Sequence, residues 1–177
     1  MRTLGPGSVS SFLKVILDVV YVALAISVVL IGCGMVVTLL FDVDPALFSN
    51  LIRAGAVDGN LTGPEIAAEL LGAGLYVGGV LVIVGELRRI FATLTAGDPF
   101  HPANVRRLRV IGLVLSALGV LEMLRYPITL LDSKFAAHEV HQGGLNVTTW
   151  FAVLVVFVLA EVFREGARLR RDAELTI

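Results

Sequence analysis

The stretch from Val15 to Phe41, VILDVVYVALAISVVLIGCGMVVTLLF, decides the fold class of this chain. Asp18 is its only charged residue, and the stretch exceeds the roughly 20 apolar residues that an α-helix needs to cross a bilayer. Three later stretches are long enough or nearly so. We therefore expect an all-α integral membrane protein, with residues 1–177 forming one domain whose four spans cover about residues 15–41, 66–85, 110–131 and 147–163.

Composition supports the same class. The chain is 56% hydrophobic and 16% charged, whereas a soluble domain has about 45 to 50% apolar and about 25% charged residues. A net charge of -1 argues against direct nucleic-acid binding, which needs a basic footprint. Cys33 is the only cysteine, so neither a disulfide within the chain nor a cysteine metal site can form.

The positions of lysine and arginine predict the orientation, because these residues stay preferentially in the cytoplasm when they flank membrane helices. Most of them fall on one side of the predicted membrane: Arg2, Lys14, Arg88, Arg89, Arg106, Arg107, Arg109, Arg164, Arg168, Arg170 and Arg171. Both termini are then cytoplasmic, with outer loops at 42–65 and 132–146, a cytoplasmic loop at 86–109 and a cytoplasmic tail at 164–177. A bacterial cytoplasmic (inner) membrane is the expected location.

Small residues predict where the helices approach one another, since membrane helices associate through close packing. Gly74 and Gly78 form a GxxxG pair, and Gly112, Ser116 and Gly119 recur along one face of the third helix. An intramolecular four-helix bundle is the favoured interpretation, and a homodimer interface remains an alternative.

Charged residues inside or beside the spans are costly unless they are neutralised. Three acids lie near the inner helix ends, beside the bases Lys14, Arg88, Arg89 and Arg164, and we expect ion pairs there: Asp18, Glu86 and Glu161. Glu122 lies deeper, about 20 Å from the inner boundary, with Arg125 three residues on. We favour mutual neutralisation of this pair, with a proton or ion site as the alternative.

The predicted cytoplasmic segments carry most of the recognisable motifs. The second helix is expected to continue until Gly97 stops it, and the third to begin after Asp98 or one turn later at Pro102, which makes a cytoplasmic helix–turn–helix connection. Phe100 is expected to anchor the turn. The tail is expected to continue the fourth helix and then to become extended at residues 175–177.

The sequence contains no complete enzyme or metal-site motif. The sequence His138-Glu139-Val140-His141 has histidines three apart, whereas the zinc protease motif places them four apart on one helix face. No phosphate-binding loop, nucleophile elbow or dinucleotide fingerprint occurs. We therefore expect a protein without catalytic residues, metal or cofactor.

Two segments resemble a known family: GDPFHPANVRRLRVIG at residues 97–112 and VFREGARLRRDAELTI at 162–177. They are similar to the bacterial membrane proteins grouped as domain of unknown function 2975. The resemblance implies a small four-helix membrane protein without assigned catalysis. It also implies a gene often placed beside a small helix-turn-helix regulator of the Cro/C1 type.

The leading functional hypothesis is a regulatory protein that binds or sequesters such a regulator through its cytoplasmic loop and tail. The candidate partner-binding residues are Phe100, Asn104, Arg106, Arg107, Leu169, Leu175 and Ile177. The alternative is a small oligomeric transporter or channel that uses Glu122 and Arg125.

Overall fold

The computed structural model describes residues 9–40, 63–98, 100–131 and 146–175, and within these ranges the chain is entirely helical apart from short turns. Its helices are α1 (Val9–Leu40), α3 (Gly63–Thr95), α4 (Pro102–Leu131) and α5 (Val147–Glu174). The all-α fold class predicted from the sequence is confirmed for the described residues.

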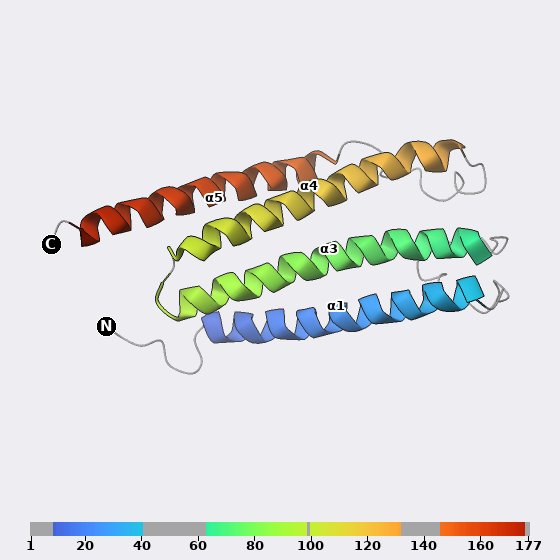
Figure 1. The fold of residues 1–177 in the computed structure, drawn as a ribbon, viewed down its shortest axis with the longest axis horizontal. Helices are drawn as coiled ribbons and strands as arrows, with labels where there is room; N and C mark the ends of the chain where they lie inside the picture. The colour runs from blue at the N-terminus through green and yellow to red at the C-terminus, as the bar shows by residue number, and fades with distance from the viewer. Residues whose placement is uncertain (1–8, 41–62, 99, 132–145, 176–177) are drawn as a thin grey trace.

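The helices pack in chain order. Helix α1 packs against α3, α3 against α4, and α4 against α5, while any other pairing of these helices makes at most marginal contact. Figure 1 shows the resulting row, with α1 and α5 on opposite sides. This arrangement is more open than the expected bundle. It is physically reasonable for a chain in lipid, because lipid tails solvate apolar helix faces that water would force into a closed core.

Successive helices run in opposite directions along the row. The start of α1, the connection between α3 and α4, and the end of α5 therefore lie at one end of the molecule, which we call the turn end (Figure 1). The basic residues that predicted the cytoplasmic side and belong to described segments all lie in the parts of the helices nearest this end, and the orientation itself stays a prediction.

Three described helical segments are long and apolar enough to cross a membrane: Phe12–Leu39, Ile66–Thr95 and Val147–Ala173. Helix α4 is not among them. Its described side chains, residues 102–124, include Arg106, Arg107, Arg109 and Glu122, and the side chains of residues 125–131 lie outside the described residues. The structure thus supports a membrane protein, while the fourth crossing stays a prediction.

Gly97 ends α3 as predicted, and the backbone shows how. Its φ is 84°, the left-handed conformation that glycine adopts without strain. The Gly97 amide donates to the Leu94 carbonyl at 3.1 Å and the Asp98 amide to the Thr93 carbonyl at 3.0 Å, which is the hydrogen-bond pattern of a Schellman motif. These bonds satisfy two carbonyls that the end of the helix leaves unpaired.

Helix α4 begins at Pro102, the later of the two predicted starts. Proline suits this first position because it has no N–H that would need a partner. His101 precedes it as the cap: its Nδ1 accepts from the Ala103 amide at 3.2 Å, and its carbonyl accepts from the Asn104 amide at 2.9 Å. Asp98 does not cap this helix and is available for another contact.

Helix α5 begins where the sequence predicts it, at Val147, with the Asn146 side chain accepting a hydrogen bond from the Thr149 amide at 3.4 Å. The expected extended end is wrong at Leu175. This residue has φ -83° and ψ -11°, and its amide donates to the Arg171 carbonyl, so the last helical turn extends through the position. A local hydrogen bond outweighs the weak preference for a strand here, and residues 176–177 lie outside the described residues.

The main buried cluster joins α3, α4 and α5 in the half of the molecule near the turn end. It consists of Ile90, Leu108, Ile111 and Ala160, with partly buried Ile83, Leu87, Leu115, Val156 and Phe163 packed against it. Helix α1 takes no part in this cluster. The core therefore fixes the three later helices relative to the connection between α3 and α4.

Candidate functional site

The connection between α3 and α4 is fastened to the end of α5 by contacts that we call the clasp, formed by Asp98, Phe100, Phe163, Gly166 and Arg170. The rings of Phe100 and Phe163 lie 5.8 Å apart, centroid to centroid, and are tilted by 53°. This separation and tilt fall within the favourable range for aromatic pairs. The predicted anchoring of the turn by Phe100 is confirmed.

Gly166 is the position on α5 that allows Phe100 to approach. A Cβ atom there would lie 2.6 Å from Cδ1 and Cε1 of the Phe100 ring, closer than non-bonded carbons approach in folded proteins. Arg170, one turn further along α5, forms an ion pair with Asp98. Residues 163, 166 and 170 are spaced at helical intervals, so one face of α5 supplies its whole share of the clasp.

A buried amide supports the turn from within. Asn104 is fully buried, its Nδ2 donates to the Thr93 hydroxyl at 2.8 Å, and that hydroxyl donates to the Ile90 carbonyl at 2.7 Å. Arg107 Nη1 donates to Asn104 Oδ1 at 2.9 Å and to the Arg89 carbonyl at 2.8 Å. Because a buried polar group is costly unless paired, this network ties α4 to the last turns of α3.

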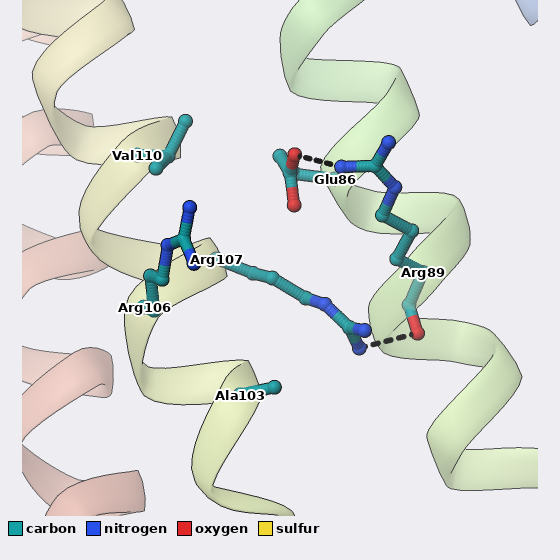
Figure 2. A pocket seen from close by; sticks show the side chains of 6 residues that line it. All are labelled: Glu86, Arg89, Ala103, Arg106, Arg107 and Val110. Atoms are coloured by element: carbon teal, nitrogen blue, oxygen red, sulfur yellow. Dashed lines mark hydrogen bonds and ion pairs between the residues drawn. The ribbon is translucent and has the colours of Figure 1, made fainter.

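A basic cavity lies beside this network, between α3 and α4. We call it the arginine pocket; it has a volume of about 290 Å³ and is lined by Glu86, Arg89, Ala103, Arg106, Arg107 and Val110. Figure 2 shows Arg107 reaching from α4 to the backbone of α3, while Glu86 and Arg89 approach from α3. Three guanidinium groups and one carboxylate thus meet in one space.

The predicted ion pairs near the inner helix ends are present. Arg88 Nε lies 2.6 Å from Asp18 Oδ1, which links α3 to α1, and the Arg88 guanidinium carbon lies 4.4 Å from the centroid of the Tyr21 ring. Arg89 Nη1 lies 2.6 Å from Glu86 Oε1. The third pair, Arg164 with Glu161, lies on α5. These acids are therefore neutralised, as charge balance predicted.

The deeper pair remains a prediction. Glu122 is exposed on α4, and the side chain of Arg125 lies outside the described residues, as do Lys134, His138 and His141. Within the described ranges, no group of three or more His, Cys, Asp or Glu side chains could hold a metal ion.

The candidate partner-binding residues separate into two groups. Phe100, Asn104 and Arg107 are engaged in contacts within the chain, and the full burial of Asn104 leaves it no surface for a partner in this conformation. Arg106, Leu169 and Leu175 are exposed, with 61% and 86% of the two leucines accessible. Ile177 lies outside the described residues. Sequence reasoning missed the contact of Phe100 with Gly166, although the spacing of Phe163, Gly166 and Arg170 marks a common face.

The small residues predicted to pack differ in how closely they approach a neighbouring helix. A Cβ at Gly74 would lie 3.3 Å from Ile31, whereas Gly78 faces open space. Gly112 approaches the Phe157 ring and Gly119 approaches Thr149 and Trp150, so this row forms the contact between α4 and α5. Ser116 donates to the Gly112 carbonyl at 2.8 Å within its own helix. Gly79, which the sequence analysis did not select, faces Leu118 of α4.

The chain matches a known protein family over much of its length. The family described as protein of unknown function, DUF2975, matches residues 63–177, which include α3, α4 and α5 and therefore the whole clasp and the arginine pocket. No curated protein and no solved structure matches the chain.

Proposed function

The chain belongs to the DUF2975 family, and from this premise we propose that it is a non-enzymatic, multi-pass protein of the bacterial inner membrane that binds a small cytoplasmic helix-turn-helix regulator. The proposal includes four crossings with both termini in the cytoplasm. It is supported by the three apolar helices and by the basic residues in the helix parts nearest the turn end.

The observation that carries the binding function is the exposed end of α5. This helix has 28 residues, which corresponds to about 42 Å against a hydrocarbon thickness of about 30 Å. Its last turns therefore project from the membrane, and they present Leu169 and Leu175 among charged neighbours. Isolated exposed leucines on a rigid helix are suited to occupy pockets on a soluble partner.

The clasp gives this end a fixed direction. The aromatic contact and the Asp98–Arg170 ion pair hold α5 against the turn before Leu175 is reached. A docking element that is ordered before binding loses less conformational entropy when its partner arrives. The structure of the turn end thus suits a preformed binding surface.

The test measures retention of a Cro/C1-type regulator, taken from the genome that encodes this chain, on the purified membrane protein. The double variant Leu169→Ser/Leu175→Ser removes both exposed leucines and leaves the clasp residues in place. We expect retention to fall at least about tenfold, the effect of losing about 1.4 kcal/mol of contact. Leu94→Ser, at an exposed leucine on the last turn of α3, is the matched control and is expected to bind normally.

Two results would overturn the proposal at different levels. Unchanged retention by the double variant would remove the end of α5 as the docking element. An unaltered chain that retains none of the regulator would remove the regulator as its partner.

The transporter alternative has less support, because the Glu122 side chain is exposed on α4 and does not belong to the arginine pocket.

A further inference from the structure

The arginine pocket is lined by more arginine side chains than its carboxylate can neutralise. Glu86 is paired with Arg89, but Arg107 donates only to uncharged acceptors, the Asn104 side chain and the Arg89 carbonyl. Arg106 is exposed and makes no hydrogen bond or ion pair within the described segments. Two guanidinium charges therefore remain without a carboxylate in a cavity that α3 and α4 build together.

The pocket also lies at a definite depth. The first turns of α4 carry the arginines, and Val110, at the opposite end of the pocket from Ala103, begins the apolar part of the helix (Figure 2). In a chain placed in the membrane by its apolar helices, this change from basic to apolar residues marks the headgroup layer on the side of the turn end. This placement puts the cavity at the depth of the lipid phosphates.

We propose that the arginine pocket binds the phosphate of an anionic phospholipid headgroup. Guanidinium groups donate paired, charge-assisted hydrogen bonds to phosphate oxygens, and Arg106 and Arg107 supply two such groups from one helix. A volume of about 290 Å³ corresponds to about ten waters at about 30 Å³ each, enough for a phosphate with its adjoining glycerol. The acyl chains would continue beyond Val110 along the apolar surface of the helices.

An anionic lipid is favoured over a zwitterionic one by the charge balance. A phosphatidylcholine headgroup brings its own cation, which competes with the arginines, whereas phosphatidylglycerol brings a single negative charge. A basic residue beside the bound headgroup contributes roughly a fivefold preference for an anionic lipid. This inference uses the membrane placement of the proposed function and is independent of the regulator.

The experiment follows lipid adducts by native mass spectrometry of the chain purified in neutral detergent, with phosphatidylglycerol and phosphatidylcholine added in turn. We expect phosphatidylglycerol to bind at least about tenfold more tightly. Arg106→Gln should reduce its affinity about fivefold, because this side chain has no structural contact to lose. Equal binding of both lipids, or an Arg106→Gln variant that binds normally, would overturn the proposal.

Two matched controls distinguish lipid binding in the arginine pocket from a general attraction of anionic lipid to the basic surface. Arg109→Gln removes the same charge from the same helix outside the pocket, and Arg168→Gln removes it from a site already paired with Glu165 and Asp172. Both should change the affinity less than twofold. Losses equal to that of Arg106→Gln in both controls would show surface attraction instead of a site.

A variant that is expected to bind more tightly provides a test that misfolding cannot imitate, because a misfolded variant would lose binding. Glu86→Gln removes the only carboxylate of the pocket and releases Arg89, so phosphatidylglycerol affinity should rise about fivefold. Excess inorganic phosphate should leave the lipid adduct in place. Displacement of the lipid by inorganic phosphate, with the same dependence on Arg106, would identify free phosphate as the ligand and overturn the assignment to a lipid.

Discussion

The clasp and the contact between α1 and α3 join helices by different means. The clasp combines an aromatic pair, a glycine that a ring covers, an ion pair and, beside it, the buried Asn104 amide. Helix α1 meets α3 through Gly74 against Ile31, Gly85 against Tyr21, and the Asp18–Arg88 ion pair. Among the described side chains of α1, residues 12–39, only Thr38 is buried.

The difference shows where this chain concentrates its specific contacts. Within lipid, small residues and apolar surfaces suffice to bring helices together, whereas the turn end uses polar and aromatic groups whose partners are fixed by geometry. The family match begins at residue 63, so it includes the clasp and leaves out α1. The matched part of this chain is thus the part with the most specific contacts.

The largest effect is expected for Asn104→Ala. It should lower the free energy of unfolding by about 2 to 3 kcal/mol, because the half-buried Thr93 and Arg107 groups each lose a hydrogen-bond partner. Thermal unfolding in neutral detergent measures the change. Thr95→Ala is the control, since its exposed hydroxyl bonds only to carbonyls of its own helix, and it should cost less than about 0.5 kcal/mol. Equal costs would contradict the structural role of the amide.

Gly166→Ala comes next. Its new methyl group would displace the Phe100 ring from α5, which should cost about 1 to 2 kcal/mol after the higher helix propensity of alanine is subtracted. The same thermal measurement applies. Gly78→Ala is the matched control in α3, where the methyl group meets open space, so this variant should be neutral or more stable. If Gly78→Ala were destabilised and Gly166→Ala were not, the close packing would lie at Gly78 and not at Gly166, which would contradict this prediction.

The ion pair between α1 and α3 should have a smaller effect. A double-mutant cycle of Asp18→Asn and Arg88→Gln is expected to give a coupling energy of about 1 kcal/mol, the upper part of the range for partly exposed pairs. Unfolding of the four chains in the cycle measures it. A coupling of zero would leave α1 attached by apolar contacts alone.

The smallest effect is expected for the ion pair of the clasp. Asp98→Asn and Arg170→Gln should give a coupling energy of about 0.5 kcal/mol in the same kind of cycle, falling as salt is added, because the Arg170 side chain is half exposed, more than that of Arg88. The aromatic contact would then be the main attachment of the clasp. A coupling larger than that of Asp18 with Arg88 would instead assign this role to the charges.

The sequence predicted those features that depend on neighbouring residues. The stop at Gly97, the start at Pro102 and the start of α5 at Val147 follow from local hydrogen bonding, and the pairs of Glu86 with Arg89 and of Glu161 with Arg164 lie within one helical turn. The pairing of Asp18 with Arg88 was also accessible, because both flank inner helix ends. Hydropathy gave the apolar spans, since lipid requires them.

Only the tertiary structure decided which faces meet. Asp98 and Arg170 are 72 residues apart, so their contact depends on the lengths and rotations of two helices, and hydropathy determines neither. The same holds for Phe100 on Gly166, for the burial of Asn104 while Arg106 stays exposed, and for the open row of helices. Apolar content determined that the helices enter a membrane, and side-chain shape determined how they pack.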